Sequence, residues 1–187
     1  MKYIYILLIP VFLISCGEKS PQDTTESLSP ANQSQSANSP FPGLFGKIEG
    51  EAISVSEARK RKAGATITLT GKIIGNKFPF VEGRASFVMG DPEKITSCDL
   101  MGEEDHCPTP WDVCCDDVNH IRNSTLSVQV LDQAGKVLKT GLKNQGGLKE
   151  LSMISIRGVI SPLSSDQAMI INAEKIMIHP EVKKLSE

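Results

Sequence analysis

Hydrophobic and polar residues alternate along several short stretches of this chain. Ile67 and Leu69 alternate with threonines, and Ile73 continues the same face beyond Gly71. A period of two is typical of a strand with one buried face. The pattern recurs along the chain, and we predict short strands over 64–75, 84–90, 125–131, 153–161 and 168–179. The folded part of the chain is therefore expected to be all-β.

Two of the predicted strands carry a glycine in the middle. Gly71 lies in I-T-L-T-G-K-I at 67–73, and Gly158 lies in I-S-I-R-G-V-I at 154–160. A mid-strand glycine lets the backbone bend sharply, as a strand must at the corner of a small closed barrel. Five short strands with two such positions predict a small five-stranded OB-like barrel.

Local signals add detail at both ends of this barrel. Ser54, followed three residues later by Glu57, forms a capping box for a short N-terminal helix that Gly64 is expected to end. The basic run at 59–62 in this helix is expected to be a solvated face. In the last strand, polar and small residues at 172–174 interrupt the apolar run and predict a β-bulge.

The first sixteen residues have the features of an export signal. Lys2 precedes an apolar run over 3–14 that is too short to span a bilayer. The run ends in L-I-S-C at 13–16, which resembles the lipobox of bacterial lipoproteins. The resemblance implies cleavage before Cys16 and lipidation of its side chain, so that the protein is anchored to a membrane through this residue.

The composition of the rest of the 187-residue chain distinguishes a tether, a folded domain and a short tail. Residues 17–45 are rich in Ser, Pro, Gln and Asn without any period, which indicates a disordered tether. We expect one folded domain over 46–180 and a frayed tail over 181–187. Gly17 after the lipidated position, in place of aspartate, resembles lipoproteins sorted to an outer membrane. The expected location is thus exported, facing the periplasm or exposed at the surface.

Several segments of the domain belong to a longer pattern. The helix and first strand at 53–75 resemble the entry of bacterial OB-fold domains found in exported proteins. The longer pattern consists of P-F-V-E-G-R-A-S-F at 79–87, C-P-T-P-W-D-V-C-C-D-D at 107–117, and the stretch over 128–160. Together they resemble an uncharacterised family of exported bacterial proteins with an OB-like domain, over about residues 65 to 178. The resemblance implies a fold and a compartment, and it supplies no catalytic residues.

An acidic, cysteine-rich insert separates the second and third predicted strands. Its residues 98–117 contain seven carboxylates and no lysine or arginine. They also hold four cysteines, an even number that favours two disulfides in an exported protein. Because a bridge between the adjacent Cys114 and Cys115 is strained, we expect Cys98 and Cys107 to pair with them in one of two ways.

A metal site is the alternative interpretation of the insert. Thiolate and imidazole ligands suit zinc or cuprous copper. The common Cys-x-x-Cys and His-x-x-x-His spacings are absent, which weighs against the usual zinc sites. A thiol-based redox protein is a third hypothesis, and no other cofactor is expected. The candidate ligands are Cys98, His106, Cys107, Cys114 and Cys115.

Charge and motifs argue against two further classes of function. From residue 46 onward, eighteen Lys and Arg face nineteen Asp and Glu, whereas proteins that bind single-stranded nucleic acid need a positive groove with aromatic platforms. No G-x-S-x-G, Walker loop or dinucleotide fingerprint occurs, so no catalytic residue is assigned. The chain therefore indicates a binding or structural module for an unknown protein or small molecule, with Trp111, Phe80 and Arg84 as candidate binding residues.

Overall fold

The computed structural model describes residues 39–101 and 107–181 of the chain. Several predicted features lie outside the described residues: the export signal with its lipobox, residues 17–38 of the expected tether, His106, and all but the first residue of the expected tail. The helices and strands, in chain order, are β1 (Ile53–Ser54), α1 (Val55–Ala58), β2 (Thr66–Lys72), β3 (Ser86–Gly90), the 3₁₀ turn η1 (Cys98–Leu100), α2 (Val118–Ser124), β4 (Thr125–Gln129), the 3₁₀ turn η2 (Gln145–Gly147), β5 (Met153–Ile160) and β6 (Ile170–Ile178).

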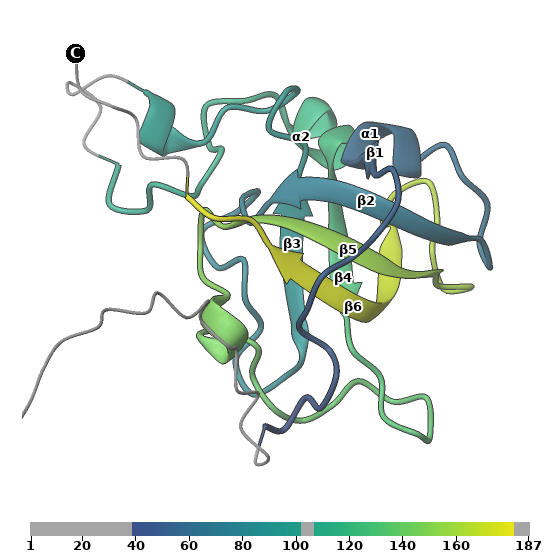
Figure 1. Ribbon diagram of the computed structural model, residues 1–187. Coiled ribbons are helices and arrows are strands. Elements are labelled where there is room, and N and C mark those ends of the chain that lie inside the picture. The colour runs from purple at the N-terminus through teal and green to yellow at the C-terminus, as the bar shows by residue number, and fades with distance from the viewer. Residues whose placement is uncertain (1–38, 102–106, 182–187) are drawn as a thin grey trace, which may run out of the picture. The chain divides into compact units, whose positions relative to one another are not determined.

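Five of the strands close into a barrel (Figure 1). Strand β2 pairs antiparallel with β3, β3 with β4, and β5 with β6, while β4 and β6 run parallel. Seven residue pairs between β2 and β5, from Thr66↔Val159 to Lys72↔Met153, complete the ring. The two-residue β1 is an extra strand parallel to β2. The predicted all-β, five-stranded OB-like barrel is confirmed, with its short N-terminal helix and its cysteine-rich loop insertion.

The mid-strand glycines lie where the backbone has no room for a side chain. A Cβ on Gly158 would come 2.3 Å from the carbonyl oxygen of Asn172 in the neighbouring strand, and one on Gly71 would come 2.8 Å from the carbonyl oxygen of Gly90. Opposite Gly158, the β5–β6 register shifts: Arg157 pairs with Lys175, while Gly158 pairs with Ala173. The intervening Glu174 is thus the extra residue of a bulge, as predicted for 172–174.

The inward side chains of the five strands fill the barrel. The largest fully buried ones in this core include Phe87, Leu69, Met89, Ile154 and Ile156. These residues occupy alternate positions of their strands, as a period of two predicts for strands with one buried face.

The folded domain begins earlier than the expected boundary at residue 46. Phe41 is 4% exposed and Leu44 is 5% exposed, and both pack in the main core. The ring of Phe45 meets that of Phe41 edge to face, with centroids 6.5 Å apart. These apolar residues stand between prolines and glycines without any period, so only their long-range contacts place them in the domain.

The helices differ from the sequence-based expectation in two respects. The capping box is present, with Glu57 N–H donating to Ser54 Oγ and Ser54 N–H donating to Glu57 Oε2, both at 3.1 Å. Helix α1 nevertheless ends at Ala58, six residues before the expected Gly64. Only Val55 and Ala58 of this helix are buried, and the basic residues that follow offer no apolar side chain to extend a packed face. Helix α2 was not predicted.

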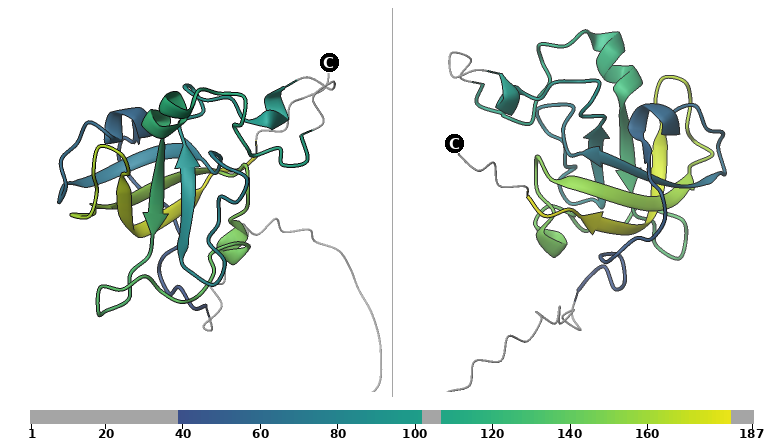
Figure 2. Two further views of the ribbon diagram at one scale, coloured as in Figure 1. Left: turned by 180° about the vertical axis from the view of Figure 1, so that it is seen from behind. Right: turned by 45° about the horizontal axis from the view of Figure 1, so that its top comes forward.

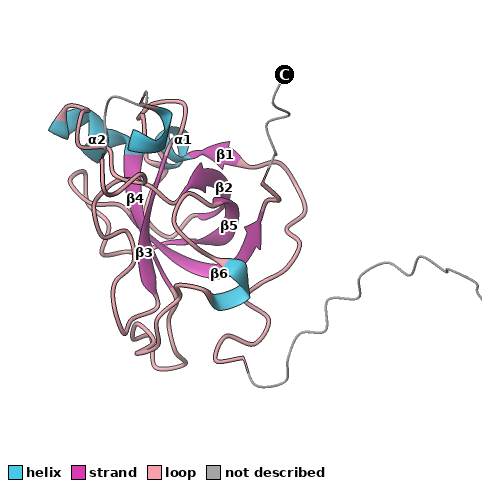
Figure 3. Ribbon diagram, turned by 90° about the vertical axis from the view of Figure 1, so that its left-hand side faces the viewer, coloured by secondary structure: helices cyan, strands magenta, loops and turns pink. Residues whose placement is uncertain are grey.

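Helices α1 and α2 lie together at one end of the barrel (Figures 1 and 3). Asp117 caps α2 by accepting hydrogen bonds from the backbone N–H groups of Asn119 and His120. Helix α2 follows directly on the cysteine-rich insert in the chain and leads into β4. Within the described residues, none of the helices has the length and apolar character needed to cross a membrane.

Candidate metal centre in the cysteine-rich loop

The cysteine-rich insert leaves the end of β3 and returns to the barrel through α2 (Figure 2). Two backbone hydrogen bonds hold its first residues against the segment at 110–112. Cys98 N–H donates to the carbonyl of Asp112 at 2.9 Å, and Asp99 N–H donates to the carbonyl of Pro110 at 2.8 Å. This pairing brings the segment that contains Cys114 next to Cys98.

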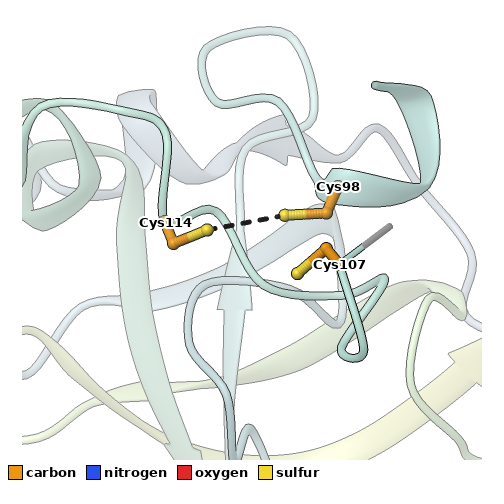
Figure 4. A group of neighbouring side chains, drawn as sticks. All are labelled: Cys98, Cys107 and Cys114. Atoms are coloured by element: carbon orange, nitrogen blue, oxygen red, sulfur yellow. Dashed lines mark hydrogen bonds between the residues drawn. The ribbon is translucent and has the colours of Figure 1, made fainter. Parts of the chain in front are cut away.

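Three of the four cysteines in the insert converge. The sulfurs of Cys98, Cys107 and Cys114 all lie within 4.8 Å of one another (Figure 4). Cys98 Sγ and Cys114 Sγ are 3.8 Å apart and form a hydrogen bond. Cys98 is buried, Cys107 is half-buried and Cys114 is exposed, so the cluster reaches from the base of the loop to solvent.

The three thiols are electrostatically unequal. Burial, together with hydrogen bonding to the other two thiols, raises the pKa of Cys98 to about 12. Hydrogen bonding with Thr109, whose hydroxyl lies 3.5 Å from Cys107 Sγ, lowers the pKa of Cys107. Cys107 therefore gives up its proton more readily than Cys98. The Cys98 thiol stays protonated until a metal ion binds or its sulfur is oxidised.

The base of the loop is tied to the barrel by a polar contact from β2. Lys72 Nζ donates to Asp99 at 3.0 Å and to Ser97 Oγ at 3.0 Å. The side chains of Lys72 and Asp99 are only 13% and 27% exposed. Because screening by water is reduced at such a site, this ion pair contributes more than a fully exposed pair. It joins strand and loop one residue away from Cys98.

A second contact fixes the other side of the loop. Trp111 Nε1 donates to the carbonyl of Lys77, and Gly75 N–H donates to the carbonyl of Trp111, so the indole docks on the β2–β3 loop. Trp111 also packs against a small core of Ile74, Ile95 and Val113, which is separate from the main core. Ile121 and Leu151 pack against the same small core. The cysteines are thus carried on a loop with packing of its own.

Replacing Lys72 by methionine is expected to destabilise the attachment of the loop by about 1 kcal/mol, because Asp99 loses its charged partner. The population of opened loop should rise about fivefold, since 1.4 kcal/mol corresponds to a factor of ten. Limited proteolysis within residues 98–117 measures this population. Lys143→Met is the control: it removes the Lys143–Glu150 pair elsewhere in the domain and should leave cleavage of this loop unchanged. Equal cleavage of both variants and the wild type would contradict the anchoring role.

The structure does not bring the candidate ligand Cys115 into the three-sulfur group, and it contains neither expected disulfide among the described residues. His106 lies outside the described residues, and Cys115 is exposed and lies outside the three-sulfur group. No disulfide joins two cysteines of the described residues. The expected pair of disulfides therefore stays a prediction. The 3.8 Å contact favours a bridge between Cys98 and Cys114, a pair that belongs to one of the two expected connectivities.

The candidate binding residues are placed in different surroundings. Phe80 is half-buried and packs on Phe87 of β3, with ring centroids 5.7 Å apart. Arg84 is exposed in the turn before β3, and Trp111 is half-buried on the β2–β3 loop. Phe80 and Trp111 thus have packing roles of their own, and a role in binding a partner stays a prediction for all three.

Two participants of the loop site were missed by sequence reasoning. Lys72 is one of several polar residues on the outer face of a strand, and nothing in its neighbourhood along the chain marks it. Its contact with Asp99 spans 27 residues and exists only in the folded protein. Thr109 had a weak signal, because it stands two residues after Cys107 in the same proline-stiffened segment.

The basic run at 59–62 lines a separate open hollow of about 540 Å³ between α1, α2 and the β5–β6 loop. The guanidinium of Arg59 joins two walls of this hollow by donating to the carbonyls of Thr125 and Asp166 at 2.9 and 2.8 Å. Lys60, Arg61 and Lys62 are exposed, as expected for a solvated face.

Comparisons with known proteins add little to this picture. None of the protein-family models matches the chain, and no curated protein sequence matches it. One similar solved structure is titled "Structure of the hypothetical protein ygiW from E. coli". It is 13% identical, with a TM-score of 0.36, over 70% of this chain and 91% of that chain. The assignment of an OB-like barrel rests on the strand pairings themselves, and the function has to be inferred from the loop.

Proposed function

We propose that this protein is an exported, lipid-anchored bacterial protein whose barrel presents a loop that binds a soft metal ion, zinc or cuprous copper. The ligands are the thiolates of Cys98, Cys107 and Cys114. One observation carries the proposal: three sulfurs from separate parts of the loop lie within 4.8 Å of one another.

The sulfur spacing is that of ligands on a common ion. A zinc–sulfur bond is about 2.3 Å, so two thiolates on one tetrahedral zinc are separated by about 3.8 Å. Cys98 Sγ and Cys114 Sγ are 3.8 Å apart. A disulfide would require about 2.05 Å. The side chains are therefore arranged for shared coordination without a large movement of the loop.

The charge of the loop supports the same proposal. Residues 98–117 hold seven carboxylates and no lysine or arginine in the sequence, and an acidic stretch of this kind attracts cations. Three thiolates are soft ligands, and such ligands select zinc or cuprous copper over magnesium or calcium. When bound, the ion would replace the thiol protons, including the one that burial retains on Cys98.

The location remains part of the proposal. The L-I-S-C motif at 13–16 supports a lipid anchor at Cys16, and the polar segment that follows it supports a tether between membrane and barrel. A soft-metal site in such a position would act on ions outside the cytoplasm. The near-neutral charge of the domain continues to argue against nucleic acid as a partner.

The test is metal retention by the full chain, purified in detergent under reducing conditions. Wild-type protein should retain about one zinc or cuprous ion after gel filtration. Cys107→Ser should weaken binding by at least about 100-fold, because even the loss of groups that only support a metal ligand costs 10- to 100-fold. Cys107 is half-buried, so this substitution should leave the fold intact, as thermal unfolding without metal can verify.

Cys115→Ser is the matched control. Cys115 is adjacent to a ligand in sequence but lies outside the three-sulfur group, so its replacement should leave affinity within about twofold of the wild type. Reduced wild-type protein that retains no stoichiometric metal would refute the proposal. Equal affinities for Cys107→Ser and Cys115→Ser would refute the assignment of the ligands.

A further inference from the structure

The sulfurs that would hold the metal are also placed to form a disulfide. Cys98 Sγ and Cys114 Sγ need to close from 3.8 Å to about 2.05 Å, a change of less than 2 Å. Their backbones are already held together by the hydrogen bonds from Cys98 to Asp112 and from Asp99 to Pro110. The two backbone segments that carry these sulfurs are therefore already adjacent before a bridge forms.

We infer that the loop is a redox-controlled metal site: oxidation joins Cys98 to Cys114, removes two of the three ligands and releases the ion. This inference rests on the proposed metal-binding function and adds its regulation. A sulfur in a disulfide has no thiolate charge to donate to a metal, so the bridged and the metal-bound forms exclude each other. Cys107 alone cannot retain the ion.

The exposures of the two sulfurs set the order of the steps. Cys114 is exposed and meets the oxidant first, whereas Cys98 is buried at the base of the loop. The oxidant is a disulfide, R–S–S–R, as is available in an oxidising compartment. The Cys114 thiolate attacks one sulfur of R–S–S–R, forms a mixed disulfide and expels one RS⁻.

The buried thiol then completes the reaction. The Cys98 thiol passes its proton to the RS⁻ released in the first step, and its sulfur attacks Cys114 sulfur in the mixed disulfide and expels the second RS⁻. The protein gains one disulfide, and the oxidant becomes two R–SH. The two protons that the products need come from the two cysteine thiols, or from water when the metal was bound. The metal ion leaves with its charge unchanged, and only sulfur is oxidised.

A reductant reverses the sequence. A small dithiol returns two electrons to the bridge, regenerates the thiols of Cys98 and Cys114 and restores the three-ligand set. The anchoring of the loop by Lys72 and Trp111 does not involve the sulfurs, so the loop keeps its place on the barrel in both forms.

The experiment treats the detergent-solubilised full chain with oxidised glutathione and follows both the linkage and the metal. Peptide mapping without reduction should find Cys98 joined to Cys114. Zinc and cuprous affinities should fall by at least about 100-fold on oxidation and return with dithiothreitol. Metal-loaded protein should be oxidised more slowly than metal-free protein, because bound thiolates are shielded from the oxidant.

Two variants separate the redox step from metal binding. Cys107→Ser should form the Cys98–Cys114 bridge as readily as the wild type while binding metal weakly even when reduced. Cys114→Ser should lose both the bridge and the metal. Cys115→Ser should keep both, which makes it the matched control for a nearby thiol in the same loop.

The possible results distinguish failure of the redox control from failure of the proposed metal binding. If reduced protein binds no metal, the proposed function fails and the inference fails with it. If reduced protein binds metal but glutathione-oxidised protein retains it, or if the mapped bridge joins a different pair, the metal site stands and the redox control is wrong. A bridge at Cys98–Cys114 with reversible metal release supports both.

Discussion

Replacing Gly158 by alanine is expected to destabilise the domain by about 3 kcal/mol, the upper end of the usual cost of overpacking. The new Cβ would lie 2.3 Å from the carbonyl oxygen of Asn172 and 3.0 Å from the Cα of Ala173. Both are backbone atoms of β6, so neither can rotate away as a side chain would. Relief would require separating β5 from β6 at the bulge, where the register already shifts.

Urea denaturation of Gly158→Ala against the wild type measures this effect. Gly141→Ala is the control, because a Cβ there would meet only Gly83 N, at the ordinary contact distance of 3.9 Å. Its effect should be within about 0.5 kcal/mol of zero. If Gly158→Ala is no more destabilising than Gly141→Ala, the glycine in β5 is not required for the approach of the two strands.

Replacing Cys16 by serine is expected to move nearly all of the protein from the membrane fraction to the soluble fraction. The proposed anchor consists of acyl chains on Cys16, and each buried CH₂ contributes about 0.8 kcal/mol to membrane association. Without these acyl chains the proposed anchor is lost.

Ultracentrifugation of lysed bacteria followed by detection of the protein measures the change. Cys115→Ser, which also exchanges one cysteine for serine, should stay with the membranes. Membrane association that persists in Cys16→Ser would contradict the lipid anchor and would favour either an uncleaved signal segment or a membrane partner. The metal-binding proposal is independent of this outcome.

The barrel itself was predictable to a large extent. Every predicted barrel strand is present, because each one buries one face and therefore alternates apolar and polar residues. The glycines in the first and fourth predicted strands marked the barrel correctly, since only glycine permits the backbone approaches seen at Gly71 and Gly158. The bulge near Glu174 followed from a break in the same alternation.

The elements without such a pattern were not predictable. Helix α2 has a single buried residue, Ser124, so it has no apolar stripe to reveal it. Helix α1 has a correct capping signal but stops at Ala58, where its packing ends. Phe41 and Leu44 belong to the core, yet they lie in a Pro- and Gly-punctuated stretch that is not distinguishable from a tether by composition.

The sequence by itself determined the strands, the barrel and the loop in which chemistry should be sought, because these depend on alternation and composition within short segments. It supplied four cysteines and left disulfide and metal as alternatives. The tertiary structure decided that Cys98, Cys107 and Cys114 converge and that Cys115 lies outside the group. It also decided that Lys72 anchors the loop through Asp99. These relations join residues up to 27 positions apart, and such distances are fixed only when the whole chain has packed.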